Sequence, residues 1–317
     1  MKKHITILGG GNGGSISIRA MKHFLNYYDI SAIVPMSDSG SSSGQLRKEF
    51  GVLPPGDILR AILAMSRYDY DMMKRIFYDT RYSKHGKLKG FGLGHLFIAF
   101  VEKYNGNIVD AIRPLAQAVD VVGPVFPVTK ENSDLCVELD NGEIIIGEHE
   151  IDRPIWERTK KIHRAFLQPT PMLYERTRQE LLDADVIIIG PGSFFTSIIA
   201  TLLPEGMKDT LRESKARIIF VPGSCVEIDG ETGPETLSAM VNILHTYLPR
   251  TVDVVLANVA ELDDIQKTYY QEKKWKQINM DVEHITDVDV MVENFELACG
   301  GFDPKKLGTI IHTWIEK

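Results

Sequence analysis

The feature that most constrains this chain is a glycine-rich turn between a short apolar run and a segment with helical periodicity. The apolar run is Ile5–Leu8, the turn is Gly9-Gly10-Gly11-Asn12-Gly13-Gly14-Ser15, and apolar residues then recur at helical spacing up to Tyr28. Glycine allows positive φ and close approach of backbone N–H groups to an oxyanion, and the following helix adds its N-terminal dipole. The pattern predicts a phosphate-binding strand–turn–helix unit. Its expected binding residues are Gly10, Gly11, Asn12, Gly13 and Gly14.

The same turn fits the fingerprint of dinucleotide-binding folds. Gly9, Gly11 and Gly14 satisfy GxGxxG, and Asp38 follows the second apolar run, where such folds place the acid that binds the ribose. A tight turn that binds no ligand is the alternative. Five glycines in seven residues would then cost folding entropy without contributing any packing.

Further apolar runs alternate with helix-like segments along the chain. They are Ser31–Val34, Val186–Ile189, Arg217–Val221 and Val252–Leu256. Such runs are typical of strands buried on both faces of a parallel sheet. We therefore expect an α/β fold, a Rossmann-like three-layer αβα sandwich with a mostly parallel sheet. We expect one nucleotide-binding domain over residues 1–317, with a division into two domains near 125–180 as the alternative.

One segment departs from the alternation. Leu135–Leu139 and Glu143–Ile146 are separated by Asp140-Asn141-Gly142, and Asn-Gly between apolar runs is a strong hairpin signal. We expect a small antiparallel hairpin inserted at about 130–150.

Composition excludes several classes of protein. The formal net charge of −7 disfavours broad binding to nucleic acid or to an anionic membrane, both of which require a basic face. The three cysteines form no CxxC pair, which indicates neither a disulfide framework nor a zinc site. The first apolar run is too short for a signal peptide, and no run reaches the roughly 18 apolar residues of a membrane helix. We expect a cytoplasmic protein whose oligomeric state is open, homodimers being common for such sheets.

A second loop follows the second apolar run and reads Ser37-Asp38-Ser39-Gly40-Ser41-Ser42-Ser43-Gly44-Gln45-Leu46-Arg47. A stretch of hydroxyls and glycines can surround a phosphate or a sugar with donors. The residues expected to bind here are Ser37, Asp38, Ser39, Gly40, Ser42, Ser43 and Arg47. The alternative is an exposed Ser/Gly linker.

Two further loops precede helix-like segments. In the first, Pro54-Pro55-Gly56 is followed by Asp57, which could cap the next helix or bind a ligand, and by Arg60, which could face an anion. In the second, Gly94 allows close backbone approach, and His95 is either a ligand-binding or a buried structural histidine.

A fifth loop follows the buried run Val186–Ile189. Ligands of open parallel sheets bind outside the carboxyl ends of the strands, where this loop should lie. The residues expected to bind are Gly190, Pro191, Gly192, Ser193 and Ser197. Phe194-Phe195 breaks the GxSxG pattern, so Ser193 is not expected to be a nucleophile. A sixth glycine-containing loop covers 222–236, where Thr232 or Thr236 could cap a helix.

Taken in order, these loops resemble the YvcK/CofD-like family of gluconeogenesis factors and 2-phospho-L-lactate transferases. GGGNGGS is similar to the family's GGGTG loop, SDSGSSSGQLR to DDGGSSGRLR, and GVLPPGDILR to GVLPPGDIRN. GFGLGHL stands where the family has GHSLGNL, ADVIIIGPGSFFTSIIATLL is similar to its GPGSLYTSI stretch, and DGETG keeps its GET. The LPPGDI and GPGSFFTS stretches are closer to the gluconeogenesis-factor branch. The chain is divergent, with Asn12 for the family's Thr, Ser39 for the second Asp, and Phe91 and His95 for the usual His and Asn.

The resemblance implies a Rossmann-like fold and a nucleotide-diphosphate ligand. In the gluconeogenesis-factor branch this is a UDP-sugar, bound in a regulatory role in carbon metabolism or cell-wall precursor supply. In the transferase branch, a phospholactyl-type group moves from a guanylyl-activated donor to a deazaflavin alcohol with the help of Mg²⁺. Asp38 would then be a metal ligand or base, with Arg47 or Arg60 as counter-charges. A nucleotide-binding regulator is the preferred hypothesis, the transferase is the second, and an NAD-dependent oxidoreductase, based on GxGxxG alone, is the third.

Overall fold

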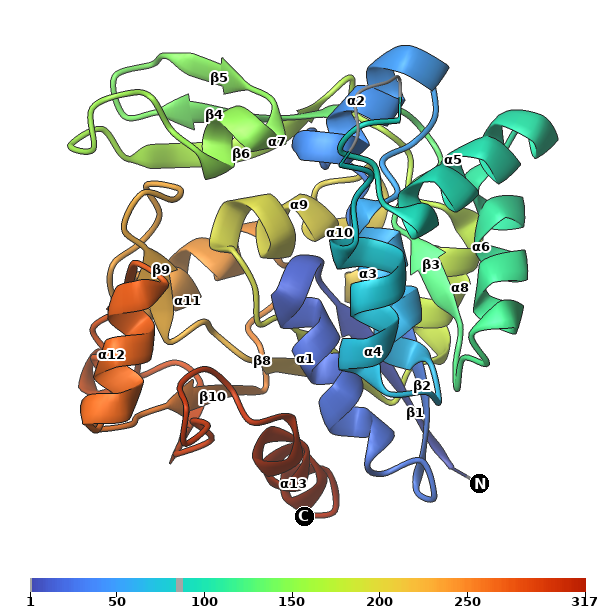
Figure 1. The fold of residues 1–317 in the computed structure, drawn as a ribbon. Coiled ribbons are helices and arrows are strands. Elements are labelled where there is room, and N and C mark those ends of the chain that lie inside the picture. Colours follow the sequence, from blue (N-terminus) through green and yellow to red (C-terminus); the bar gives the residue numbers. More distant parts are fainter. Residues whose placement is uncertain (1, 84–87) are drawn as a thin grey trace.

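The computed structural model describes residues 2–83 and 88–317. Its centre is a seven-stranded, wholly parallel sheet with the strand order β12-β10-β8-β7-β1-β2-β3 (Figure 1). The strands of this sheet are β1 (Lys3–Leu8), β2 (Tyr28–Val34), β3 (Val125–Pro127), β7 (Val186–Ile189), β8 (Arg217–Phe220), β10 (Val254–Asn258) and β12 (Asp289–Glu293). The apolar runs of the sequence thus form the sheet as predicted.

The centre of the sheet is also the centre of the hydrophobic core. β1 pairs in parallel with β2 on one side and with β7 on the other, from Ile5 opposite Val186 to Leu8 opposite Ile189. The four residues of β7 are all buried, as expected for a strand covered on both faces.

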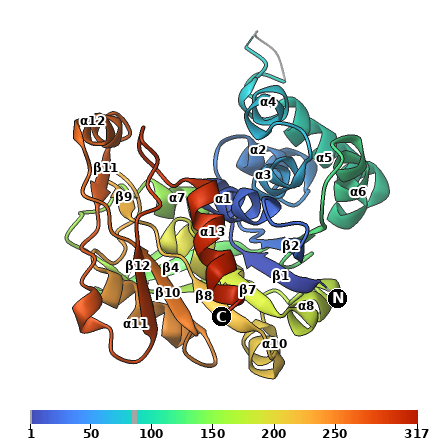
Figure 2. The same cartoon turned by 90° about the horizontal axis from the view of Figure 1, so that it is seen from below.

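Helices cover both faces of the sheet, so the three-layer sandwich is confirmed. Figure 2 shows α1, α3 and α13 on one face and α8, α10 and α11 on the other. The helices are α1 (Gly11–Lys22), α2 (Ser41–Phe50), α3 (Gly56–Met65), α4 (Tyr70–Lys74), η1 (Arg75–Asp79), α5 (Leu93–Asn105), α6 (Ile108–Ala118), α7 (Glu148–Asp152), α8 (Glu175–Asp183), η2 (Phe194–Ile199), α9 (Ala200–Leu202), α10 (Met207–Glu213), α11 (Leu237–Tyr247), α12 (Asp264–Glu272), η3 (Val282–His284) and α13 (Pro304–Ile315). No helix in the described part of the chain is long and apolar enough to cross a bilayer.

The predicted hairpin is part of a larger antiparallel sheet. β4 (Asp134–Leu139) pairs with β5 (Ile144–Ile146) across the Asn-Gly turn, and on its other side with β6 (Ile162–Gln168). The expected insertion at about 130–150 was therefore too short, because a third strand lies beyond α7. This three-stranded sheet lies beside α2 (Figure 1). A second small sheet pairs β9 (Cys225–Glu227) with β11 (Trp275–Gln277).

Candidate functional site

The topology places the candidate site at a reversal in strand order. From β1 the chain builds outward to β2 and β3, and β7 then returns to the opposite side of β1. The loops that follow β1 and β7 therefore diverge at the carboxyl edge of the sheet, where open α/β sheets bind their ligands. The two loops touch, since a Cβ on Gly13 would lie only 2.1 Å from the Pro191 carbonyl oxygen.

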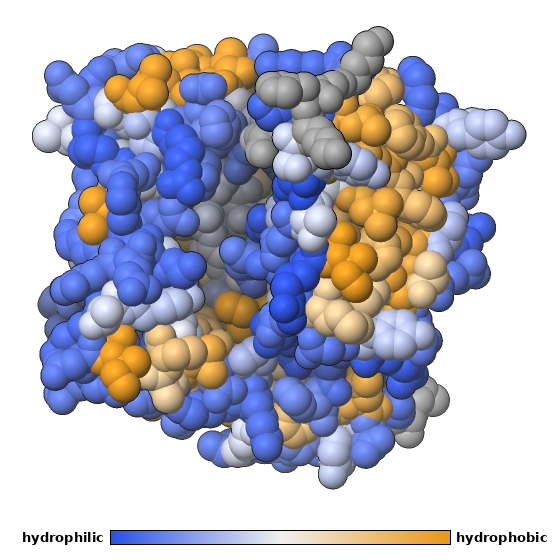
Figure 3. All heavy atoms as spheres, in the orientation of Figure 1, coloured by the Kyte–Doolittle hydropathy of each residue, from blue (hydrophilic) through white to orange (hydrophobic). Residues whose placement is uncertain are grey.

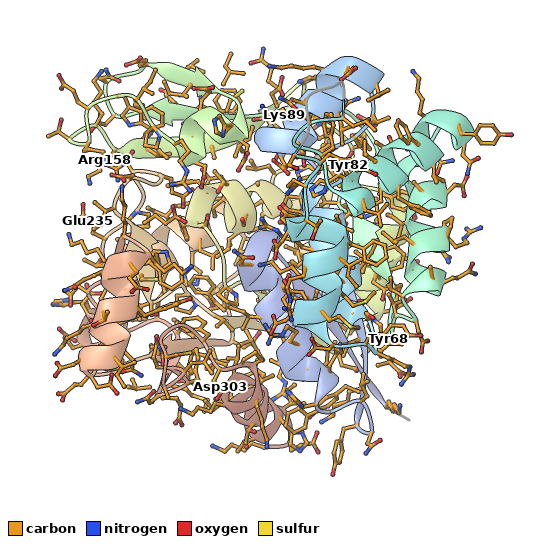
Figure 4. All side chains as sticks on the ribbon, in the orientation of Figure 1. Tyr68, Tyr82, Lys89, Arg158, Glu235 and Asp303 are labelled. Carbon is orange, nitrogen blue, oxygen red and sulfur yellow. The ribbon has the colours of Figure 1, made fainter. Side chains whose placement is uncertain are left out.

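A cavity of about 580 Å³ opens at this edge. In Figure 3 it is the hollow at the centre of the molecule, with a largely hydrophilic rim. In Figure 4, Arg158 and Glu235 lie on one side of this hollow, and Tyr82 and Lys89 on the other. The residues predicted from the sequence that line the cavity are Gly10, Gly11, Asn12, Gly13, Asp38, Gly40, Ser42, Ser43, Asp57, Arg60, His95, Pro191, Gly192, Ser193 and Ser197.

Six predicted residues do not line the cavity: Gly14, Ser37, Ser39, Arg47, Gly94 and Gly190. Three of these glycines are explained by packing. A Cβ on Gly14, Gly94 or Gly190 would lie 2.6–2.7 Å from a neighbouring heavy atom. The predicted counter-charge role of Arg47 has no support from its position. Its guanidinium bonds Asp134 Oδ1 at 3.0 Å and the Ser133 carbonyl at 3.1 Å, so it joins α2 to β4.

Carboxyl groups occupy the starts of two helices that follow predicted binding loops, α1 after the predicted phosphate-binding turn and η2 after the fifth loop. At α1, Asp57 Oδ1 accepts from the Gly11 N–H at 2.8 Å. At η2, Glu231 accepts from the Phe195 and Thr196 N–H groups at 3.1 Å. Asp57 lies inside α3 and does not cap it, so the alternative of Asp57 as a helix cap is wrong. Thr236, by contrast, does cap α11 through the Ala239 N–H.

Burial raises the pKa of both carboxyl groups. The pKa of Asp57 rises to about 6 because of burial and the nearby charge of Asp38. The pKa of Glu231 rises to about 7, again mainly through burial and against the effect of its backbone donors. Each group is therefore protonated at a higher pH than an ordinary carboxyl group.

The Asp38 loop is tied to α7 by reciprocal hydrogen bonds. The Ser39 N–H donates to Glu148 Oε2 at 3.3 Å, and Ser39 Oγ accepts from the His149 N–H at 2.9 Å. Burial, then the charge of Asp38, raises the pKa of Glu148 to about 9. Ser39, which replaces an acid of the resembled family, thus holds α7 against the loop.

The part of the cavity wall near Tyr78 is cationic and aromatic. The guanidinium carbons of Arg60 and Arg81 lie 4.4 and 5.1 Å from the centre of the Tyr78 ring, and His95 packs against that ring at 4.8 Å. His95 is buried, and its Nδ1 has no hydrogen-bond partner in the described residues. Burial and the two arginines lower the pKa of His95 to about 3, so its imidazole is neutral.

A third wall of the cavity, formed by the C-terminal segments, was not predicted from the sequence. Tyr270, Trp275 and Phe302 line the cavity there. Tyr270 is held by a 2.9 Å hydrogen bond to Glu296, whose other oxygen accepts from Asn258 at 2.7 Å. The residues of α7 that line the cavity were missed as well. Neither the C-terminal residues nor those of α7 lie in a recognisable sequence motif, because only tertiary packing brings them to the site.

The cavity contains few groups suited to covalent chemistry. Burial raises the pKa of the Cys225 thiol to about 12, which keeps it protonated and unreactive. Within the described ranges, no group of three or more His, Cys, Asp or Glu side chains is arranged to hold a metal ion. Mg²⁺ commonly needs only one or two carboxylates besides its phosphate ligands.

Comparison with known proteins gives a consistent result. The family model of 2-phospho-L-lactate transferase CofD matches residues 5–297. A Thermotoga maritima protein is 34% identical over 92% of this chain and 90% of its own length. The gluconeogenesis factor of Bacillus subtilis is 31% identical over 90% of this chain and 87% of its own.

The fold comparison agrees. A crystal structure of a UPF0052 family member from Bacillus halodurans superposes with a TM-score of 0.88, at 28% identity, over 98% of this chain and 99% of that one. The chain therefore belongs to the CofD/YvcK family, which includes the gluconeogenesis factors.

Proposed function

We propose that this protein binds a nucleoside diphosphate sugar, a UDP-sugar, and acts as a regulator without turning it over. The observation that carries the proposal is the continuity of the cavity. It runs from the aromatic wall at Tyr270 and Trp275, past the contact between the β1 and β7 loops, to Arg60 and Asp38. Its volume lies within the range of typical small-molecule sites.

The middle of the cavity suits a diphosphate. A Cβ on Gly11 would lie 3.6 Å from both Arg60 Nη1 and Ser197 Oγ, so a guanidinium and a hydroxyl lie beside the Gly11 backbone in the cavity. Arg60 Nε has no partner in the described residues. A phosphate oxygen at this point would receive charge-assisted hydrogen bonds.

The two ends suit a base and a sugar. The rings of Tyr270, Trp275 and Phe302 provide surfaces against which a nucleobase can stack. At the other end, the Asp38 carboxylate can accept hydrogen bonds from sugar hydroxyls, and Glu148, whose raised pKa keeps it protonated, can accept through its carbonyl oxygen and donate through its O–H. The name that the relatives share, gluconeogenesis factor, and the protonated Cys225 thiol support a regulatory role in carbon metabolism.

A transferase is the second candidate, favoured by one observation. Asp38 and Asp57 carry charges close enough for Asp38 to raise the pKa of Asp57. A divalent cation would relieve this repulsion, and the two carboxylates fit Mg²⁺ held jointly with ligand phosphates. When bound, Mg²⁺ would neutralise charge on the diphosphate, while Arg60 would orient it.

A thermal-shift panel with UDP, UDP-glucose, GDP, GTP and NAD, each with and without Mg²⁺, separates the candidates. A ligand at 100 times its Kd adds about 2.7 kcal/mol to the stability. Stabilisation by UDP-glucose without Mg²⁺ supports the regulator. A guanine preference that requires Mg²⁺ supports the transferase, and stabilisation by NAD alone contradicts both.

A site variant tests the location. Gly11→Val fills the space between Arg60 and Ser197 and should abolish binding. Its matched control is Gly142→Val in the exposed β4–β5 turn, another glycine with positive φ, where a Cβ meets nothing within 4 Å. Unchanged binding by Gly11→Val would show that the ligand lies elsewhere.

A further inference from the structure

Three arginines line the cavity, and they differ in how their charge is balanced. Arg153 pairs with Asp152 and with Glu227. Arg60 and Arg81 form no ion pair with any side chain in residues 2–83 and 88–317, although both are partly buried. Both guanidinium groups lie against Tyr78. Burial acts to lower the pKa of Arg60, yet the charges of Asp57 and Asp38 help to raise it overall, although neither carboxylate forms an ion pair with it. A partly buried cation that lacks an ion-pair partner costs free energy until an anion joins it.

The two unpaired arginines face different parts of the cavity. Arg60 approaches Gly11 and Ser197, where the proposed function places the diphosphate. Arg81 is tied instead to the second loop, because its Nη1 donates to Ser42 Oγ at 2.6 Å. The Ser42 hydroxyl in turn donates to the Gly90 carbonyl at 2.9 Å. This second hydrogen bond orients the hydroxyl so that its oxygen accepts from Arg81. Arg81 thus marks a second anion-binding position, beside neutral His95.

The second loop, which Arg81 contacts through Ser42, also gathers hydrogen-bond acceptors for neutral donors. Asp38 Oδ1 and Glu148 Oε2 lie 3.5 and 3.6 Å from the position that a Cβ on Gly40 would take, so both converge on the second loop. Both also accept from backbone N–H groups, of Gly40 and Ser39 respectively. The same end of the cavity therefore combines acceptors suited to sugar hydroxyls with one guanidinium suited to an acidic group.

We propose that Arg81 selects the sugar, and that the ligand is a nucleotide-activated acidic sugar, a uronic acid whose carboxylate pairs with Arg81. The inference rests on the proposed function and specifies its substrate class. Arg60 binds the diphosphate that all nucleotide sugars share. Arg81 binds the carboxylate that distinguishes a uronic acid from a neutral hexose, with Asp38 and Glu148 accepting from the hydroxyls.

The test is calorimetric titration of UDP, UDP-glucose and UDP-glucuronate at one fixed ionic strength. The wild-type protein should bind UDP-glucuronate at least about tenfold more tightly than UDP-glucose, the effect of one charge-assisted hydrogen bond. Arg81→Gln should reduce the ratio to within about twofold, because UDP-glucuronate loses more affinity than UDP or UDP-glucose does. Arg60→Gln should weaken all three ligands. The matched surface control is Arg75→Gln on η1, where the side chain is exposed, and it should change nothing.

The outcomes are distinguishable. Equal wild-type affinity for UDP-glucose and UDP-glucuronate overturns the inference and leaves the proposed function intact. A loss of UDP affinity in Arg81→Gln equal to its loss of UDP-glucuronate affinity also overturns it, since Arg81 would then bind the diphosphate. Failure of all three ligands to bind overturns the proposed function as well. If Arg81→Gln does not fold, Arg81→Lys serves as the second variant. Because Lys keeps the charge, this variant should keep part of the preference for UDP-glucuronate over UDP-glucose. Loss of the whole preference in Arg81→Lys would contradict an ion pair between residue 81 and the ligand carboxylate.

Discussion

The Asp57 carboxylate accepts a 2.8 Å hydrogen bond from the Gly11 N–H, across 46 residues of sequence. This contact places an acid at the start of α1, where sequence patterns of this type predict a phosphate. A ligand must therefore share the glycine loop with Asp57, using the open side of Gly11 that faces Arg60 and Ser197.

The first prediction concerns the pH dependence of stability. Because the pKa of Asp57 is raised to about 6, its contribution to stability is greatest below the unfolded pKa and is lost as pH rises through 6. Asp57→Asn keeps an acceptor for Gly11 and removes the charge. At pH 7.5 it should be more stable than wild type by about 1–2 kcal/mol, with little gain at pH 4, as measured by urea unfolding. A pH-independent difference would contradict this account.

Glu231 gives a second prediction. Glu231→Ala leaves the Phe195 and Thr196 N–H groups without their acceptor, which should cost about 1–3 kcal/mol. Glu231→Gln keeps one acceptor oxygen and should cost less. Since the pKa of Glu231 is raised to about 7, the wild-type protein should lose stability between pH 6 and 8 relative to Glu231→Gln. Guanidinium unfolding at both pH values measures this, and parallel curves would argue against a raised pKa.

The glycine loop supplies a third prediction, because its glycines serve different purposes. A Cβ on Gly13 would lie 2.1 Å from the Pro191 carbonyl oxygen, so Gly13→Ala should force the β1 and β7 loops apart and cost about 3 kcal/mol. Gly11 has a φ of +63°, and a Cβ there would make only ordinary van der Waals contact, at 3.6 Å from Arg60 Nη1 and Ser197 Oγ. Gly11→Ala should cost only about 1–2 kcal/mol, from the left-handed backbone. Thermal unfolding compares the two, and equal losses would contradict the distinction.

Arg47 gives a fourth prediction, which tests the sequence-based expectation directly. Its bonds to Asp134 and Ser133 join α2 to β4. Arg47→Ala should lower stability by about 1–2 kcal/mol and leave the affinity for UDP-glucose unchanged within twofold. A tenfold loss of affinity for UDP-glucose at unchanged stability would instead support the sequence-based prediction that Arg47 is a counter-charge for the ligand.

The sequence predicted what depends on local pattern. Ile5–Leu8 and Val186–Ile189 were recognisable as strands because each run is rich in β-branched and aliphatic residues and ends in glycine. Parallel pairing then required their loops to meet at one edge. Most of the predicted binding residues do line one cavity, as this pairing requires.

What the sequence did not reveal depends on distant contacts. Glu148 lies in a five-residue helix with no distinctive motif, and its approach to Ser39 follows from the packing of the inserted sheet. The third strand of that sheet, β6, lies beyond α7, too far along the chain for a hairpin signal. Trp275 and Phe302 likewise reach the cavity only after the C-terminal segments fold back.

The cavity joins the two extremes of the chain, since Gly10–Gly13 and Phe302 line the same space. α13 then packs against α1 so closely that a Cβ on Gly308 would lie 2.4 Å from the Ala20 carbonyl oxygen. During synthesis, the glycine loop emerges long before Phe302, and the cavity cannot form until the later segments have folded back. A metabolite that binds only the closed cavity stabilises only chains in which both segments are in place, and chains that lack the later segment remain exposed to proteolysis.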